Sequence, residues 1–348
     1  MIKHAKEKSL TVDVAVVIVN YATPELTMRA VAALAGERKA LPQLRAVVVD
    51  GGSPDRSADF LRAQFEGDQY RGWVTFMPLS LNGGFGWANN QAVLKLARQD
   101  RPPEFIHFLN PDTEVARGSV VALLNEIQAN PKCAAVGSQL LNADGTAAAS
   151  AFRFPSAGRE FVGGAQSERL GRLFGILATV IPSSRSKEVD WVTGASFMVR
   201  AKALQECGLF DDGFFLYFEE VELMHRFHSH GWSIRHVPES RVVHIEGAAT
   251  GLASENGQRP LPPYWYQSRR RYFGLTGGRA AVLASGAAAV MGISVATLKQ
   301  LALRTAKASG FRFRDFMDAG FFPTAATMRP SVPKWGDVPG RPPAWMVL

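Results

Sequence analysis

Apolar runs that alternate with helical periodicity constrain this chain more than any other feature. Residues 14–19, VAVVIV, and 45–50, RAVVVD, are β-branched runs that indicate strands buried on both faces. Between them, PELTMRAVAALAG has the spacing of an amphipathic helix and ends at Gly36. Two more strand candidates follow, WVTFMPL and EFIHFLN, with the helical QAVLKLARQ between them. This alternation predicts an α/β fold with a doubly wound, mostly parallel sheet and helices on both faces.

The rest of the chain carries weaker signals. Residues 135–188 are less regular, with AAVGSQLLNADG as a strand and turn. WVTGASFMVRAKAL predicts a strand entering a helix, and FLYFEEVELMHRFHSHGW predicts a second helix that ends at Gly231. Two short strands, SIRHV and RVVHI, are expected next, and SENGQRPLPP, residues 254–263, has the composition of a linker.

Composition limits the class of protein. With 348 residues and 47% hydrophobic residues, the chain can bury one large core or a core plus a smaller annex. Cys133 and Cys207 lack metal-ligand spacing and are too few for a disulfide framework, so we expect reduced thiols in a cytoplasmic protein. Lysines before the first apolar run imitate a signal peptide, but Asp13 interrupts the pattern and a buried strand is the better interpretation.

Positive charge is concentrated in one C-terminal segment. The net charge is +8, and residues 265–314 contain nine Lys or Arg and no acidic residue. No nucleic-acid-binding motif accompanies them, so the segment favours an anionic membrane surface over nucleic acid. Residues 280–298 are uncharged, but Gly and Ala dominate them and basic residues flank both ends. We therefore prefer an interfacial or docked helix to a membrane span, and irregular structure from Pro323 onward.

Polar residues follow several predicted strands at the edge where doubly wound sheets bind ligands. Asn20, Asp50, Asn82 and Asp112 each lie at or just past the carboxyl end of a strand. Asp50 is suited to bind a base or ribose, although a turn aspartate is the commoner alternative. The loop LNGGFGWANN combines glycines with a helix N-terminus that attracts anions, but it lacks the lysine of a GxxxxGK[ST] loop.

Two segments carry groups that suit a divalent cation. In LNPDTEV, Asp112 and Glu114 alternate after a strand, so their oxygens can face the same way. Carboxylate oxygens bind Mg²⁺ or Mn²⁺, which share their coordination with diphosphate. The alternative is that Asp112 caps a helix formed by TEVARGSVVALLNEI. His244 ends the strand RVVHI and could join a metal shell, although lone histidines are more often structural.

The stretch FLYFEEVELMHRF places three glutamates among aromatic side chains. On a helix, Glu219 and Glu222 share a face, whereas Glu220 is rotated by roughly 100° from Glu219, so the three cannot point at one site. One alternative is that they complement the dipole of a helix start. Glu222 is better explained as a structural partner of Arg226, four residues further along the helix. Partial desolvation would raise the pKa of a carboxylate here and make it a better base.

Seven segments, in this order, resemble the family 2 glycosyltransferases of the GT-A fold, with the bacterial rhamnosyltransferase-like branch as the nearest in appearance. They are VIVNYATPELT, VVVDGGSPD, NGGFGWANN, FLNPDTEV, GASFMVR, YFEEVELMHR with HGW, and VVHIEGAAT. The likeness covers roughly residues 12–275 and implies a GT-A domain over residues 1–253. That domain would have a nucleotide-sugar half at about 12–115 and an acceptor half at about 116–253. Residues 254–348 would form a linker and a basic, helical, membrane-associated C-terminal segment.

The resemblance also implies roles for single residues. Asp112 would be the metal-binding acid, and His244 would approach the metal and the diphosphate. Glu220 stands where the family has its general base, and Glu219 lies next to it beside the acceptor pocket. The implied nucleotide-sugar pocket contains Asn20, Tyr21, Asp50, Asn82, Gly84, Asn90 and Asp112. The chain departs from the usual pattern where Glu220 and Glu222 replace the aspartates of YFEDVDL and where DGGS replaces DNGS.

The implied function is inverting transfer of a sugar from a nucleoside-diphosphate donor, with dTDP-rhamnose as one candidate. Glu220 would accept the proton of the acceptor hydroxyl, and Mg²⁺ or Mn²⁺ would stabilise the departing diphosphate. The acceptor would be a polyprenyl-diphosphate-linked saccharide for lipopolysaccharide or another surface polysaccharide, handled on the cytoplasmic face of the membrane. One alternative is a nucleotidyltransferase, which would need a basic glycine-rich loop where VIVNYATPELT has none. The other is a non-catalytic glycan-assembly partner of the same fold.

Overall fold

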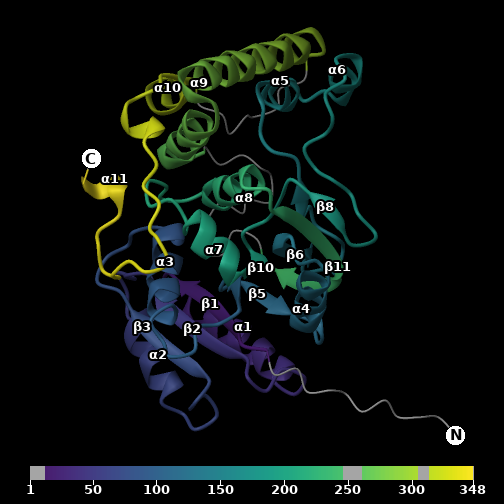
Figure 1. The fold of residues 1–348 in the computed structure, drawn as a ribbon. Coiled ribbons are helices and arrows are strands. Elements are labelled where there is room, and N and C mark those ends of the chain that lie inside the picture. Colours follow the sequence, from purple (N-terminus) through teal and green to yellow (C-terminus); the bar gives the residue numbers. More distant parts are fainter. Residues whose placement is uncertain (1–11, 246–260, 305–312, 348) are drawn as a thin grey trace, which may run out of the picture.

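A nine-stranded mixed sheet forms the centre of the molecule (Figure 1). The structure is a computed structural model that describes residues 12–245, 261–304 and 313–347. The strand order is β3-β2-β1-β4-β10-β6-β11-β5, and β8 also pairs with β11. The strands are β1 (Val14–Asn20), β2 (Arg45–Asp50), β3 (Val74–Pro78), β4 (Phe105–Leu109), β5 (Thr113–Val115), β6 (Cys133–Leu141), β8 (Lys187–Val189), β10 (Ser196–Arg200) and β11 (Ser233–His244). A small second sheet joins β7 (Ala151–Phe152) to β9 (Trp191–Val192).

Helices cover both faces of the large sheet, as predicted. They are α1 (Pro24–Glu37), α2 (Ser57–Phe65), α3 (Phe85–Leu96), α4 (Ser119–Ala129), α5 (Ala157–Ala165), α6 (Glu168–Leu173), α7 (Ala201–Cys207), α8 (Glu219–Ser229), α9 (Pro263–Ala302), α10 (Phe313–Phe316) and α11 (Ala344–Val347), with short turns of π-helix at Met317–Phe321 and 3-10 helix at Ala326–Met328. Alternate residues of β1 face opposite sides: Val16 belongs to the core under α1 and α4, and Val17 to the core under α3 and α8. Both side chains are fully buried, which explains the unbroken apolar sequence.

The first four strands form the predicted parallel half. β1 pairs in parallel with β2 and with β4, and β2 pairs in parallel with β3. Their carboxyl ends therefore meet at one edge of the sheet. The sheet becomes mixed at β10, which runs antiparallel to both β4 and β6.

The prediction of two short strands at 233–244 was wrong, because these residues form one strand, β11. Its register against β6 shifts between Val237 and Arg241, where a bulge accommodates Pro238. Ser240 in this bulge is fully buried and shares a hydrogen bond of 2.9 Å with Ser138 of β6. Pro238 interrupts the sequence pattern, but the bulge keeps the strand continuous.

The alternative in which a helix starts at Thr113 was also wrong. Thr113–Val115 form β5, which pairs antiparallel with β11. Helix α4 begins only at Ser119, after Gly118 has turned the chain with a φ of 84°. Asp112 therefore does not cap a helix at this place.

The C-terminal part is helical at first and then irregular, as predicted. α9 is broken at Gly278, which has a φ of 66°, and it packs against α5 at one end of the molecule (Figure 1). Among the described residues, α9 is the one helix long and apolar enough to cross a membrane by length and composition alone. The predicted domain boundary at 253/254 and most of the predicted linker lie outside the described residues, and Pro263 already begins α9. Cys133 and Cys207 are buried free thiols.

Candidate active site

A cleft of about 260 Å³ opens at the carboxyl ends of β1, β2 and β4. Six separate parts of the chain contribute to its walls. The lining includes Val19, Tyr21, Gly51, Asn82, Gly84, Asn110, Phe215 and Tyr264. Tyr21, Asn82 and Gly84 were predicted to bind a nucleotide sugar, and the structure places them together here. This is the edge at which the doubly wound topology predicts ligand binding.

Asp50 lies beside this cleft in a closed hydrogen-bond network. Its carboxylate accepts hydrogen bonds from Asn20 Nδ2 at 2.7 Å, from Ser53 Oγ at 2.7 Å and from Ser53 N at 3.0 Å. Asn20 Oδ1 in turn accepts from Thr27 Oγ1 at 2.9 Å. Asn20 and Asp50 are paired residues at the ends of β1 and β2, so the strand register itself brings them together. Asn20 therefore orients the Asp50 carboxylate.

The glycine-rich loop before α3 contacts the segment that leads into α8. Phe85 N donates to Phe215 O at 3.1 Å, and Asn82 Oδ1 accepts from Gly84 N at 3.1 Å. Gly84 has a φ of 91°, and a Cβ at this residue would lie 2.0 Å from Phe215 O. Only glycine permits this close approach, so Gly84 fixes one wall of the cleft.

Asn90 does not reach the cleft. Its side chain is fully buried and donates to Phe210 O at 2.9 Å and to Asp212 Oδ1 at 2.7 Å. Its Oδ1 accepts from Phe210 N at 3.0 Å. These contacts connect α3 to the loop after α7. Asn90 therefore has a structural role, whereas a contact with the nucleotide sugar was predicted for it.

Asp112 and His244 face each other at the end of the sheet. Pairing of β5 with β11 sets His244 opposite Thr113, and His244 Nε2 lies 3.3 Å from Asp112 Oδ1. Asp112 is 4% exposed, and its Oδ1 accepts no hydrogen bond. The expectation that Glu114 shares this direction was wrong, because Glu114 forms an ion pair of 2.5 Å with Arg29 of α1.

Asp112 Oδ1 and His244 Nε2 lie at a separation that suits two ligands of one divalent cation. Two ligands at right angles around an ion, with bonds of about 2.1 Å, lie about 3 Å apart. A buried carboxylate oxygen without a hydrogen-bond partner is costly unless a cation compensates it. In the described part of the chain, no group of three or more His, Cys, Asp and Glu side chains could hold a metal. A bound Mg²⁺ or Mn²⁺ would therefore need further oxygens, such as those of a diphosphate.

Glu219 and Glu220 begin α8 after a strained turn. Tyr217 and Phe218 have φ values of 70° and 68°, a conformation that costs non-glycine residues on the order of 1–3 kcal/mol each. Burial raises the pKa of the Glu220 carboxyl, and burial together with the charge of Glu220 raises the pKa of Glu219 well above its ordinary value. In both residues, Oε2 is buried and has no hydrogen-bond partner. The predicted increase in basicity is thus present.

Gly194 of the GASFMVR segment lies beside the Glu220 side chain. A Cβ on Gly194 would lie 3.5 Å from the carboxyl carbon of Glu220. The next residue, Ala195, accepts a hydrogen bond from Asn110 N at 2.9 Å, and Asn110 lines the cleft. Glu220 is therefore connected to the cleft through the paired ends of β4 and β10.

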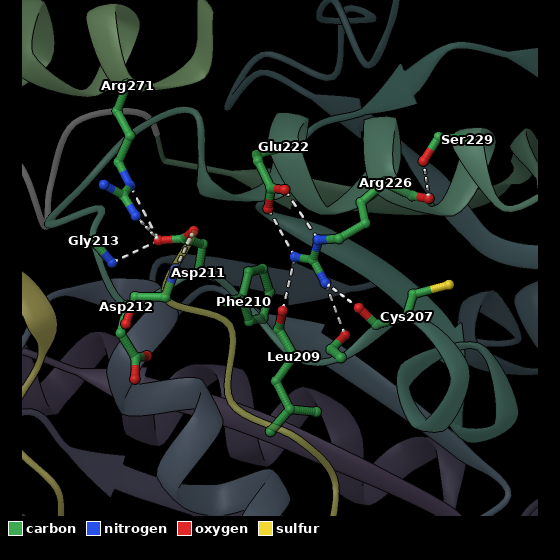
Figure 2. Close-up of polar contacts among 12 residues, drawn as sticks. Cys207, Leu209, Phe210, Asp211, Asp212, Gly213, Glu222, Arg226, Ser229 and Arg271 are labelled. Atoms are coloured by element: carbon green, nitrogen blue, oxygen red, sulfur yellow. Dashed lines mark hydrogen bonds and ion pairs between the residues drawn. The ribbon is translucent and has the colours of Figure 1, made fainter. Parts of the chain in front are cut away.

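Glu222 has a structural role, as predicted. Its carboxylate accepts hydrogen bonds from Arg226 Nε at 3.0 Å and from the guanidinium Nη2 at 2.7 Å (Figure 2). Arg226 also donates to the carbonyl oxygens of Cys207 at 2.7 Å and Leu209 at 2.8 Å. The Glu222–Arg226 pair thereby joins α8 to the end of α7.

Sequence reasoning missed several residues of this site. Ser53 had a local signal, since a serine three residues after an aspartate commonly closes a turn. Gly194 belongs to GASFMVR, one of the segments that resemble the family, but no contact was predicted for it. Tyr264 had no local signal, because α9 brings it to the cleft from far along the chain.

Comparisons with known proteins agree with this geometry. The sequence profile described as Glycosyl transferase family 2 matches residues 15–205, and that of Glycosyl transferase family group 2 matches residues 166–328. An N-acetylglucosaminyl-diphospho-decaprenol L-rhamnosyltransferase of Mycobacterium tuberculosis is 28% identical over 190 residues, covering 51% of this chain and 61% of the relative. Rhamnosyltransferase WbbL of Escherichia coli is 27% identical over 169 residues, covering 46% of this chain and 60% of the relative. The matches thus span about three fifths of these relatives.

Two solved structures share the fold. GalNAc-T7 with UDP, GalNAc and Mn²⁺ aligns with a TM-score of 0.58 at 16% identity, covering 89% of this chain and 57% of the other. The mannosyltransferase PcManGT from Pyrobaculum calidifontis, in complex with GDP-Man and Mn²⁺, aligns with a TM-score of 0.52 at 14% identity, covering 85% and 76%. At these identities the likeness establishes the α/β fold of the GT-A type and nothing finer.

Proposed function

This chain belongs to glycosyltransferase family 2, and we propose that it transfers a sugar from a nucleoside diphosphate to a saccharide acceptor with inversion at the anomeric carbon. The observation that carries this proposal is the placement of three acidic groups around the carboxyl ends of β2 and β4. Asp50 is held by Asn20 and Ser53, and Asp112 faces His244. Glu220 lies beside Gly194, and burial raises its pKa. Each group would meet a different requirement of the reaction: nucleoside binding, metal binding or proton acceptance.

The chain's own residues account for binding and proton transfer. Asp50 and Tyr21 bind the nucleoside, and the glycine-rich loop lies against the sugar diphosphate. Asp112 and His244 would hold Mg²⁺ or Mn²⁺, which supplies positive charge to the diphosphate when it is bound. Glu220 accepts the proton of the acceptor hydroxyl as that oxygen bonds to the anomeric carbon and the bond to the diphosphate breaks. Desolvation of Glu220 strengthens it as a base.

We propose dTDP-rhamnose as the donor and a polyprenyl-diphosphate-linked saccharide as the acceptor. Both similar proteins are named as rhamnosyltransferases, which supports rhamnose as the sugar. The name of the Mycobacterium tuberculosis relative includes a diphospho-decaprenol acceptor, which supports a lipid-linked saccharide. The product would enter a bacterial surface polysaccharide such as lipopolysaccharide. Family membership favours this transfer over the nucleotidyltransferase alternative.

A lipid-linked acceptor would require contact with a membrane, which we propose occurs peripherally on the cytoplasmic side. The C-terminal ends of α6 and α9 lie at the same end of the molecule (Figure 1). Exposed apolar side chains lie at both helix ends. They include Leu173, Phe174, Leu298 and Leu301, with Arg172, Lys299 and Arg304 among them. Apolar and basic side chains together suit an anionic bilayer surface. Co-sedimentation with vesicles should therefore increase when phosphatidylglycerol replaces phosphatidylcholine.

A panel of sugar nucleotides tests the proposed donor and metal. The melting temperature of the chain should rise with dTDP-rhamnose plus Mn²⁺, since a ligand of the folded state stabilises it. The increase should shrink with EDTA and in Asp112→Asn. No response to any sugar nucleotide, with or without metal, would contradict the proposal.

A further inference from the structure

The last part of the described chain, residues 329–347, returns to the nucleotide half of the sheet. We call it the strap. Figure 1 shows it in yellow, running from the region of α10 past α3 to α11. The strap lies beyond both ranges matched by the family profiles, which end at residues 205 and 328. Family membership therefore says nothing about its role.

One end of the strap binds the loop LFDDGFF, residues 209–215, which leads toward Glu219 and Glu220. Leu209 N donates to Pro333 O at 2.9 Å, and Asp212 N donates to Ser331 O at 2.8 Å. Ser331 N donates to Asp211 Oδ2 at 3.0 Å. The strap thus pairs with this loop through backbone groups and one buried carboxylate.

Arg271 of α9 joins the strap to the same carboxylate. Its guanidinium donates to Asp211 Oδ1 at 2.6 Å and 3.0 Å (Figure 2). It also donates to the carbonyl oxygens of Ala326 at 2.8 Å and Arg329 at 2.9 Å. The side chains of Arg271 and Asp211 are 5% and 0% exposed. A Cβ on Gly213 would lie 2.0 Å from the guanidinium carbon, so the loop closes tightly around Arg271.

The other end of the strap holds the cleft wall. Trp87 Nε1 of α3 donates to Arg341 O at 2.8 Å, and Gly340 N donates to Gln91 Oε1 at 2.6 Å. Trp345 Nε1 donates to Gly83 O at 3.1 Å, in the glycine-rich loop. The Trp345 ring also meets the Phe215 ring edge to face, with centroids 5.1 Å apart.

Trp345 therefore touches both segments whose close contact shapes the cleft. Gly83 precedes Gly84, which lines the cleft, and Phe215 lines it from the opposite segment. Phe85 N and Phe215 O connect these two segments directly. An edge-to-face aromatic contact and a hydrogen bond at this junction limit the motion of both walls.

We propose that the strap is a working part of the donor site and that Trp345 is a positioning residue for the nucleotide sugar. It acts through Gly83 and Phe215 and does not touch the reacting atoms. This inference rests on the proposed function. It assigns the C-terminal residues a role in donor affinity, in addition to the membrane role proposed for the end of α9.

Kinetics of Trp345→Ala and Trp345→Phe test this inference. Trp345→Ala should raise the KM for the donor about tenfold, because it removes both contacts, and leave the KM for the acceptor and the kcat within about twofold. Trp345→Phe keeps a ring against Phe215 but loses the bond to Gly83, so its donor KM should be intermediate. Met346→Ala, in the same turn and 45% exposed, serves as the matched control and should behave as wild type.

Calorimetric titration with dTDP and Mn²⁺ distinguishes a failure of the inference about Trp345 from a failure of the proposed function. Weaker dTDP binding by Trp345→Ala, at a melting temperature close to that of Met346→Ala, supports the inference. Wild-type donor KM and dTDP affinity in both Trp345 variants would overturn it while leaving the proposed function intact. Equal losses of donor affinity, acceptor affinity and kcat would assign Trp345 a merely structural role. A wild-type protein that neither binds dTDP nor transfers sugar would refute the proposed function, and the inference with it.

Discussion

The two halves of the candidate site are built by different means. Asp50 stands at the end of a central parallel strand, where the neighbouring strand supplies Asn20 and the following turn supplies Ser53. Glu220 stands after a turn with two left-handed residues and faces a glycine, and one of its oxygens has no hydrogen-bond partner. The Asp50 carboxylate accepts three hydrogen bonds, whereas the Glu220 carboxylate keeps one oxygen without a partner, and burial raises its pKa.

Contacts between residues far apart in the sequence hold the strained turn before Glu220 in place. The loop of residues 209–215, which precedes the strained turn, is bound by Asn90 from α3, by Arg226 from α8, by Arg271 from α9 and by Ser331 from the strap. The strand ends near Asp50 depend mostly on the pairing of the adjacent strands β1 and β2. We infer that strain in a functional turn persists because the surrounding elements over-determine it.

The largest effect is expected for Glu220→Gln. Loss of a general base commonly costs about 10²- to 10⁴-fold in rate, and the amide is nearly isosteric with the carboxyl. Transfer should fall by that factor, whereas the affinity for dTDP with Mn²⁺ should stay unchanged. Progress curves and calorimetry measure the two quantities. Full activity in this variant would remove Glu220 as the base.

A smaller but still large effect is expected for Arg271→Ala. It leaves the Asp211 carboxylate buried without its charged partner, which should lower the free energy of unfolding by about 3–5 kcal/mol. Arg271→Lys keeps the charge but loses the paired hydrogen bonds of the guanidinium, so its free energy of unfolding should lie between those of wild type and Arg271→Ala. Urea unfolding provides the values. Arg279→Ala, on the exposed side of α9, is the control, and equal stability of Arg271→Ala and Arg279→Ala would contradict the account.

Asn20→Ala probes the other half of the site. Removal of the hydrogen bond to Asp50 leaves a buried carboxylate with one partner fewer and should cost about 1–3 kcal/mol of stability. The affinity for dTDP should fall as well. Tyr21→Ala is the matched control, because Tyr21 is 37% exposed and lines the cleft, so it should weaken binding with little change in stability. Equal unfolding free energies of the two variants would argue against an organising role for Asn20.

The smallest expected effect is a pH dependence in the loop of residues 209–215. Burial raises the pKa of Asp212 to about 7, above the ordinary value of 3.8. Because the folded state binds this proton more tightly, the stabilisation is complete below pH 4 and is lost as pH rises toward 7. Asp212→Asn removes this titrating group and should flatten the decline of the free energy of unfolding with pH. Asp68→Asn, on the exposed surface, should not change it.

Prediction from sequence succeeded where local patterns determine structure. The β-branched runs and helical spacings gave β1 to β4 and α1 correctly, and the pairing of Glu222 with Arg226 followed from helical geometry. It failed at Pro238, where a bulge hid the continuity of β11, and at Glu114, where α1 supplied Arg29 from a distance. Asn90 looked like part of a binding loop, yet its partners, Phe210 and Asp212, lie more than one hundred residues away. No local signal could reveal such contacts.

Stereochemistry of the product tests the central claim most directly. Wild-type protein is incubated with dTDP-rhamnose, Mn²⁺ and a polyprenyl-diphosphate-linked N-acetylglucosamine, and the anomeric configuration of the new linkage is read by NMR. Direct attack by a hydroxyl deprotonated by Glu220 predicts a product inverted relative to the donor, formed by wild type and not by Glu220→Gln. A product of retained configuration, or equal product from Glu220→Gln, would contradict it.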